Sequence, residues 1–355
     1  MTDHRDAAAP TSLAELLHRG DLDGLVREVD RRSNAADWDG VLLLRDRCLA
    51  AAEELGKQLW GAAQYAEYRV ALEAPAPTAA AVVLPGAARF ALGPLTEVVA
   101  QTHTWAELAD HLDATVAPVV AQERIVRGED LSDDPRAGLD DVGLPGRLQP
   151  WEPRYALPTY RPAERLDGGP APARAAPVEL PAGAVPGRPT QLPELERALV
   201  DLVAPWERES SGEVHVATVE GDAAGAVAAL VAGRARLVPL RLPEALVRMA
   251  WAGASGGARG RRRGTAAGRA AAWWVGHAAT GLVFPAAPDD LEFHLEELTW
   301  YAFDEGGEDA GWRLRLVVED HAAGWAAAVD AADRDDEDDD VAGDRRDDGR
   351  EPRAL

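Results

Sequence analysis

The stretch that decides the fold runs from Leu298 to Val318. It contains two strand-like segments, Leu298-Thr-Trp-Tyr-Ala-Phe303 and Trp312-Arg-Leu-Arg-Leu-Val-Val318. In the second segment apolar and arginine side chains alternate, which is typical of a strand with one buried face. The residues between the segments are rich in glycine and aspartate and favour a turn. We therefore predict an antiparallel β-hairpin at this point of the chain.

The residues upstream of this hairpin predict a mixed domain at 194–330. Short alternating runs at Val214–Val219 and Leu237–Leu242 favour further strands. Helical spacing of apolar side chains predicts helices between these runs and after them, including one that begins at Pro243. We predict an α+β domain with a small antiparallel sheet.

The first part of the chain, 1–131, predicts a succession of helices. Ser12 with Glu15 and Thr104 with Glu107 have the spacing of capping boxes, in which two side chains close the start of a helix. Gly56 separates two amphipathic segments and predicts a helical hairpin. A further helix is expected over Ala79–Phe90. We predict a helical, solenoid-like domain, so that the fold class is α+β and predominantly α.

Two other segments differ in composition. Residues 132–193 hold 13 of the 25 prolines, which predicts a linker whose later part, 167–189, is solvated. Within it, Trp151, Tyr155 and Tyr160 alternate with prolines and could dock on a neighbouring domain in extended form. Residues 331–355 are predicted to form an acidic disordered tail.

The charge and composition exclude several classes of function. The formal net charge of −24 opposes general binding to nucleic acid or to an anionic membrane. The only lysine, Lys57, lacks the flanking residues of a phosphate-binding P-loop. The single Cys48 excludes an internal disulfide and is expected to be a buried, inert thiol. We expect a cytoplasmic protein with no membrane partner, because no signal peptide and no membrane span are predicted. We also expect no cofactor.

A run without acidic residues stands out between Ala245 and Pro288. It carries a glycine-rich arginine cluster that is suited to binding an anion, because guanidinium groups keep their charge and donate in a fork to phosphate or carboxylate. Its ligand is either a nucleic acid or phosphorylated molecule, or the protein's own acidic surface. The aspartate run Asp335–Asp340 is a candidate for the second case. The candidate anion-binding residues are Arg259, Arg261, Arg262, Arg263 and Arg269.

A second motif overlaps this cluster. Gly253-Ala-Ser255-Gly-Gly257 has the spacing of the nucleophile elbow of serine hydrolases, and Asp304 and His321 follow in the expected order. The elbow must follow a buried strand, whereas the residues before Ser255 predict a helix. A serine hydrolase using Ser255 is therefore the alternative from another class. The eight histidines are scattered without the spacing of a metal site, so we expect no metal.

Two segments, Thr96–Trp105 and Gly260–Trp274, resemble those of a family of uncharacterised proteins from high-GC bacteria. This resemblance implies no activity and no functional residues. The interpretation that the residues favour is a non-catalytic interaction or scaffold protein, with another protein as its partner.

Overall fold

The computed structural model describes residues 12–56, 58–139, 142–180, 183–306 and 311–334. The chain forms two compact units. Unit 1 comprises Met1–Arg124 and Thr159–Leu166, and unit 2 comprises Ile125–Pro158 and Asp167–Leu355. The segment predicted as a linker is thus divided between the two units, because its aromatic residues are core residues rather than spacers.

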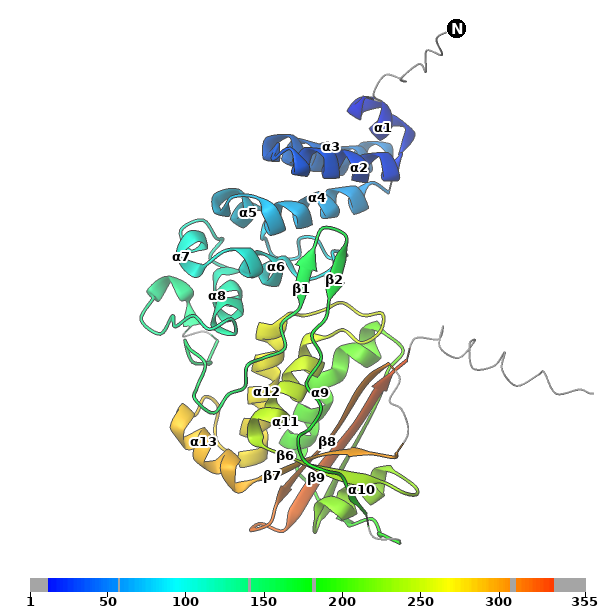
Figure 1. Ribbon diagram of the computed structural model, residues 1–355, viewed down its shortest axis with the longest axis vertical. Helices are drawn as coiled ribbons and strands as arrows, with labels where there is room; N and C mark the ends of the chain where they lie inside the picture. The colour runs from blue at the N-terminus through cyan, green and yellow to red at the C-terminus, as the bar shows by residue number, and fades with distance from the viewer. Residues whose placement is uncertain (1–11, 57, 140–141, 181–182, 307–310, 335–355) are drawn as a thin grey trace, which may run out of the picture. The chain divides into compact units, whose positions relative to one another are not determined.

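Unit 1 is built from helices and a small hairpin (Figure 1). Both predicted capping boxes are present, with Glu15 N–H donating to Ser12 Oγ at 3.3 Å and Thr104 N–H donating to Glu107 Oε2 at 2.8 Å. The elements are α1 (Leu13–Arg19), α2 (Leu22–Asn34), α3 (Trp38–Leu55), α4 (Trp60–Glu73), α5 (Ala76–Val82), α6 (Leu95–Thr102), α7 (Trp105–Leu108), α8 (Ala117–Ile125), β1 (Thr159–Arg161) and β2 (Glu164–Leu166).

The helical hairpin predicted at Gly56 is confirmed. Gly56 ends α3 in the left-handed conformation, with φ of 60°, which glycine adopts without a steric penalty. Cys48 is buried in α3, and burial raises the pKa of its thiol to about 11. The helix predicted over Ala79–Phe90 is wrong at its end: α5 stops at Val82, because Pro85 cannot continue a helix and restricts the residue before it.

Unit 2 contains an antiparallel sheet of seven strands in the order β3-β6-β7-β8-β9-β5-β4. The predicted hairpin is confirmed as β7 and β8. The helices outweigh the strands in the described residues, and the fold class is α+β and predominantly α, as predicted. The sheet is larger than the small sheet that the sequence predicts. Its strands are β3 (Val178–Glu179), β4 (Arg188–Pro189), β5 (Glu213–Glu220), β6 (Arg236–Leu240), β7 (Thr299–Asp304), β8 (Trp312–Asp320) and β9 (Trp325–Asp333).

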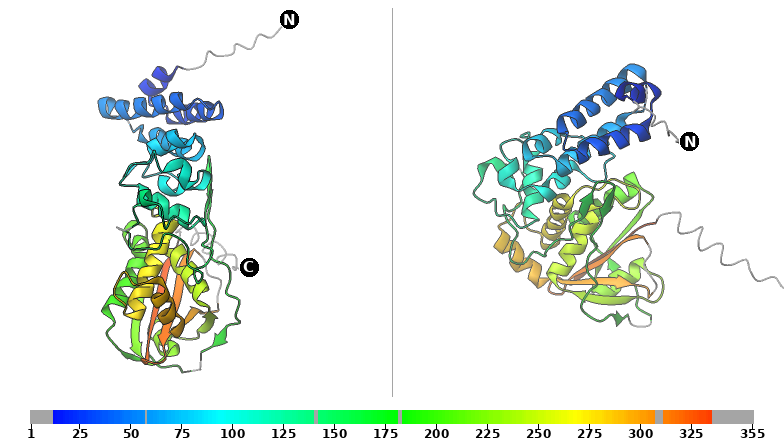
Figure 2. Two further views of the ribbon diagram at one scale, coloured as in Figure 1. Left: turned by 90° about the vertical axis from the view of Figure 1, so that its left-hand side faces the viewer. Right: turned by 45° about the horizontal axis from the view of Figure 1, so that its top comes forward.

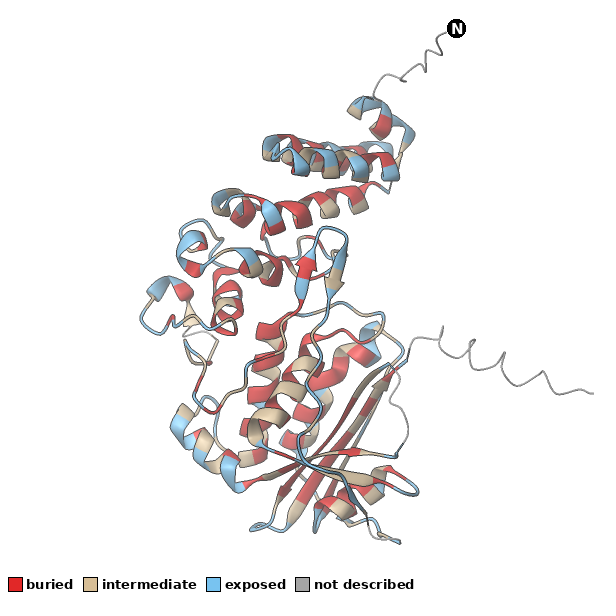
Figure 3. Ribbon diagram, in the orientation of Figure 1, coloured by how far each residue is buried: buried red, intermediate tan, exposed pale blue. Residues whose placement is uncertain are grey.

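Helices cover both faces of this sheet unequally (Figures 1 and 2). One face carries α9 (Pro193–Glu209) and α11 (Leu242–Ala254). On these two helices packs α12 (Thr265–Thr280), which in turn contacts α13 (Pro288–Glu297). The other face carries α10 (Ala223–Leu230). Figure 3 shows the buried residues gathered between these layers. Trp206, Trp273 and Trp300 are among the largest fully buried side chains and supply much of the volume of this alanine-rich core.

Two predictions about the ends of unit 2 need correction. The segment 167–189 is not merely solvated, because it supplies β3 and β4, the two edge strands of the sheet. Pro189 has no N–H to donate, which suits an edge position. The predicted tail at 331–355 begins too early, because β9 continues to Asp333; residues 335–355 lie outside the described residues. No helix among the described residues is both long and apolar enough to cross a membrane.

Candidate functional site

The predicted arginine cluster lies in the loop that joins α11 to α12. Arg259, Arg261 and Arg263 are exposed. The Arg262 side chain is only 5% exposed, and its Nη2 donates to Thr265 Oγ1 at 3.0 Å. Arg261 Nε lies 3.6 Å from Glu209 Oε2. The five predicted arginines therefore do not form one surface.

The backbone of this loop binds a carboxylate from its own chain. Asp333, at the end of β9, is 1% exposed, and its Oδ2 accepts the Ala258 N–H at 2.6 Å. A Cβ at Gly257 would lie 2.1 Å from the same oxygen, so the close approach requires glycine. Ser211 Oγ lies 3.3 Å from Asp333 Oδ1. The proposed contact between the loop and the run Asp335–Asp340 falls outside the described residues.

Arg269 is buried and faces away from any external anion, which corrects its place in the predicted set. Its side chain has no exposed area, and it binds Glu152 in a fork, with Nε to Oε2 at 2.8 Å and Nη2 to Oε1 at 2.7 Å. Its Nη groups also donate to the carbonyl oxygens of Pro145 and Arg147 at 3.2 and 3.1 Å. Arg269 thus holds the proline-rich segment 145–152 against α12.

Glu152 is the acceptor at the centre of this buried network. It also accepts from the Tyr155 hydroxyl at 2.6 Å and from Trp273 Nε1 at 3.0 Å. Burial alone raises the pKa of Glu152, but the hydrogen bonds and charge of Arg269 outweigh it, so the pKa lies below its usual value. Burial, followed by the Glu152 charge, raises the pKa of Tyr155 well above its ordinary value.

Ser255 does not have the surroundings of a hydrolase nucleophile. It is 2% exposed and ends helix α11, not a strand. Its Oγ accepts from Trp206 Nε1 at 2.9 Å and donates to the Ala252 carbonyl at 3.0 Å. The predicted partners are engaged elsewhere: Asp304 pairs with Arg236, and His321 Nδ1 lies 2.8 Å from Glu319 Oε1. Ser255 caps a helix and anchors a tryptophan.

Replacing Ser255 with alanine is therefore expected to lower the stability of the fold, not to remove a hydrolase nucleophile. The variant leaves the buried Trp206 Nε1–H without its acceptor, which should lower the free energy of unfolding by about 1–3 kcal/mol. Urea unfolding measures this loss. A fluorophosphonate probe should leave the wild-type chain unlabelled, and labelling that disappears in Ser255→Ala would contradict this role.

Metal binding has no support from the arrangement of side chains in the described ranges. No group of three or more His, Cys, Asp or Glu residues is placed there to hold an ion. His294 Nδ1 lies 3.4 Å from Glu297 Oε2 within one helical turn, as an ordinary surface pair.

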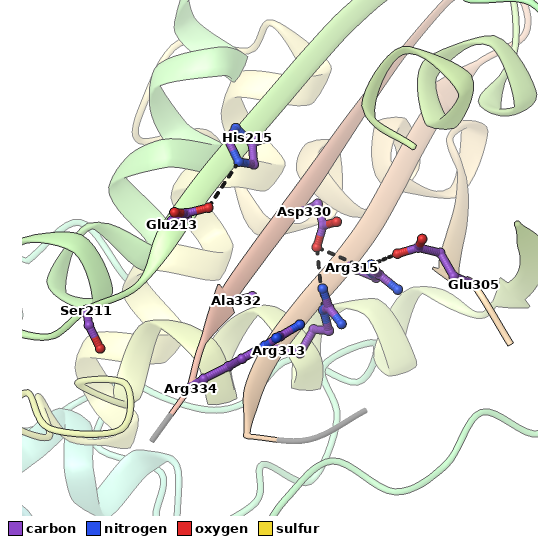
Figure 4. Close-up of a pocket in the computed structure, with 9 residues that line it drawn as sticks. All are labelled: Ser211, Glu213, His215, Glu305, Arg313, Arg315, Asp330, Ala332 and Arg334. Carbon is purple, nitrogen blue, oxygen red and sulfur yellow. Dashed lines mark hydrogen bonds and ion pairs between the residues drawn. The ribbon is translucent and has the colours of Figure 1, made fainter. Parts of the chain in front are cut away.

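A hollow lies on the sheet face that α10 only partly covers (Figure 4). Its volume is about 450 Å³. Ala332 forms its floor on β9, between Glu213 of β5 and Arg313 of β8, its direct partners in the sheet register. We call it the Ala332 hollow; it is lined by Ser211, Glu213, His215, Glu305, Arg313, Arg315, Asp330, Ala332 and Arg334.

The charges in the Ala332 hollow are mixed. Arg315 Nε donates to Asp330 Oδ1 at 3.1 Å, and its Nη2 contacts Glu305. Burial lowers the pKa of Arg315, but its bonds to these two carboxylates outweigh that effect and raise it above its ordinary value. Arg313 Nε lies 3.7 Å from the same Asp330 oxygen. In Figure 4, Arg313 points towards Asp330, and Arg334 extends from the end of β9 towards Arg313.

A second concavity lies on unit 1 and is largely aromatic. Its volume is about 290 Å³. Trp60 of α4 and Phe90 pack at its edge in a tilted arrangement, with ring centroids 4.8 Å apart. We call it the aromatic groove; it is lined by Trp60, Gly61, Gln64, Tyr65, Tyr68, Phe90, Ala91, Leu92, Pro162 and Ala163.

Sequence reasoning missed both concavities. The alternation of Arg313 and Arg315 places both on one face of β8, but the partner strand that carries Asp330 was not predicted. The aromatic groove combines residues from α4, from the segment 90–92 and from the hairpin β1–β2. No periodicity in the sequence links these three segments.

The fold and these sites define an α+β protein with a helical unit, a sheet unit and two candidate binding concavities. The chain belongs to the DUF6183 family, a family of unknown function whose model matches residues 23–335. The expected membership of a family without an assigned activity is confirmed at this level. No curated protein and no solved structure matches the chain.

Proposed function

We propose that this protein is a non-catalytic interaction protein that binds an extended apolar segment of another protein in the aromatic groove. The observation that carries the proposal is the exposure of large apolar side chains around one concavity. Trp60 is 41% exposed, Phe90 67% and Leu92 36%. Contiguous exposed apolar surface around a cleft is typical of binding sites, and tryptophan is enriched among the residues that dominate binding energy.

The two tyrosines of the groove have their polar ends satisfied within unit 1. Tyr65 donates its hydroxyl to Asp30 Oδ1 at 2.6 Å, and Tyr68 donates to the Arg161 carbonyl at 2.6 Å. Burial raises the pKa of both hydroxyls, so both stay neutral at physiological pH. The half-buried Tyr65 ring therefore offers an apolar surface to a ligand, whereas Tyr68 is buried and supports the groove from beneath. An apolar partner leaves no polar group of these tyrosines unpaired.

The shape of the groove favours a narrow ligand. A volume of about 290 Å³ accommodates a few side chains, which a short extended segment can supply. Extended segments that contain proline bind aromatic-lined grooves with a small entropic cost, because their backbone is already ordered. An extended segment with proline or aliphatic residues is the partner chemistry that we propose.

Selection of peptides from a random displayed library on the full-length protein tests this function. We expect the selected sequences to converge on a short motif with proline or aliphatic residues. Replacing Phe90 with alanine should abolish the enrichment, because the variant removes an exposed wall of the groove. A failure to converge, or a motif retained fully by Phe90→Ala, would contradict the proposal.

Unit 2 offers a matched control pair. Trp274 is 41% exposed, as Trp60 is, and its ring contacts Phe284 at a centroid distance of 5.7 Å. Phe284→Ala removes an exposed aromatic side chain from a similar pair outside the groove. The peptides selected on the wild-type protein should bind this variant unchanged.

A further inference from the structure

The Ala332 hollow is independent of the aromatic groove and lies on a different unit. One row of side chains crosses three adjacent strands there: Glu213, Ala332 and Arg313. The middle position carries only a methyl group, so an acid and a guanidinium face each other across a gap. Adjacent strands lie about 4.8 Å apart, which separates the backbones of the outer two residues by roughly 10 Å.

The neighbouring row consists of His215, Asp330 and Arg315. Asp330 and Arg315 bind each other, and the Arg315 side chain is only 5% exposed. This row is therefore a preformed wall of the hollow. A group bound against it would not have to order these two side chains, which reduces the entropic cost of binding.

A second arginine, Arg334, lies directly after the end of β9 and lines the gap. Arg334 follows Ala332 by two residues, lines the same hollow and is exposed. Together Arg313 and Arg334 offer two guanidinium groups to an oxyanion placed over Ala332, and such charge-assisted hydrogen bonds are the strong ones. Glu213 is 81% exposed on the opposite side of the gap and offers an acceptor to a cation.

We propose that the Ala332 hollow binds a small zwitterion of amino-acid or dipeptide size, with its carboxylate at Arg313 and Arg334 and its ammonium group at Glu213. A simple anion fits less well, because Glu213, Glu305 and Asp330 line the same hollow and repel it. A simple cation also fits less well, because Arg313, Arg315 and Arg334 line the hollow and repel it. Only a ligand with both charges complements both sides of the gap, and a volume of about 450 Å³ accommodates it.

Thermal unfolding of the full-length protein with single ligands tests this site. The probes are the individual L-amino acids and glycyl dipeptides, with acetate and methylammonium as the two half-ligands at equal concentration. At least one zwitterion should raise Tm in a saturable way, since a ligand that binds only the folded state stabilises it. Neither half-ligand should do so.

Three variants locate the binding. Ala332→Leu fills the floor, and Arg334→Gln removes one guanidinium from an exposed position. Each should weaken binding of the active zwitterion roughly ten-fold or more in calorimetric titration. Arg188→Gln, at an arginine that is 76% exposed outside the hollow, should leave the affinity unchanged.

The unliganded Tm of each variant checks that it folds, and Arg334→Gln carries the test if Ala332→Leu does not. The absence of stabilisation by every zwitterion would overturn the proposal. So would an equal effect of acetate, or full affinity in the folded variants.

Discussion

Replacing Arg269 with methionine is expected to lower the free energy of unfolding by about 3–5 kcal/mol at neutral pH. The substitution leaves the Glu152 carboxylate buried without the guanidinium that binds it in a fork. Methionine keeps much of the apolar volume, so the loss reports the uncompensated charge rather than a cavity. Urea unfolding monitored by tryptophan fluorescence measures it.

The pH dependence distinguishes this cause from a general packing defect. In the wild-type chain the pKa of Glu152 is lowered, so its contribution is present above the ordinary value of 4.5 and is lost as the pH falls through the folded value. Without Arg269, burial should raise that pKa above its ordinary value. The difference between the two proteins should therefore be largest near neutral pH and should shrink in acid. A difference that is constant with pH would contradict the charge-based explanation.

Arg188→Met is the matched control, because it removes a guanidinium from an exposed ion pair instead of a buried one. Arg188 and its partner Glu220 are 76% and 48% exposed, so solvent screens their attraction. The loss should stay below about 1 kcal/mol. A loss as large as that of Arg269→Met would show that burial is not the deciding factor.

Replacing Gly268 with alanine is the second change with a large expected effect. A Cβ there would lie 2.0 Å from the Ala250 carbonyl oxygen and 2.9 Å from the Ala254 Cβ. The nearer atom belongs to the backbone of α11 and cannot rotate away, so α11 and α12 would have to separate. We expect a loss of roughly 3 kcal/mol in the free energy of unfolding.

Gly276 in the same helix gives the opposite expectation. A Cβ at that position would meet its nearest neighbour, a Leu295 methyl carbon, at 3.4 Å, which is an ordinary contact. Gly276→Ala should therefore be neutral or stabilising by up to about 1 kcal/mol, because alanine is the better helix former. Thermal unfolding compares the two variants directly. Equal changes in the two variants would contradict this explanation, because helix propensity favours alanine at both positions and only the helix–helix contact distinguishes them.

The hairpin β7–β8 was predictable because its alternation is local. The neighbouring strand β9 was not, since Trp325-Ala-Ala-Ala-Val-Asp-Ala-Ala-Asp333 is rich in alanine, which favours helices. Its position between β8 and β5 decides its conformation. Ala327 packs towards the helices on one face and Ala328 towards α10 on the other. Small residues suit a strand covered on both faces, and that context is tertiary.

The proline-rich segment shows the same limit of local reasoning. Its composition predicts a linker, yet Trp151 and Tyr155 are buried in unit 2 and Tyr160 is buried in unit 1. The alternation of aromatic residues with prolines did suggest docking in extended form. What the sequence could not provide is Arg269, a distant residue that anchors the segment through Glu152.

The roles of the predicted site residues also depend on contacts with residues that are distant in the sequence. Arg269 has the same chemistry as Arg263, but the first is buried and the second exposed. Ser255 has the spacing of a nucleophile, but the hydroxyl binds Trp206. Composition identified these residues as unusual, and only the fold assigns their roles.

The affinity of a peptide selected on the wild-type protein, measured for Phe90→Ala and for Phe284→Ala, tests the central claim most directly. We predict a loss of roughly ten-fold or more in Phe90→Ala and wild-type affinity in Phe284→Ala. Equal affinities in the two variants would contradict a partner-binding role for the aromatic groove.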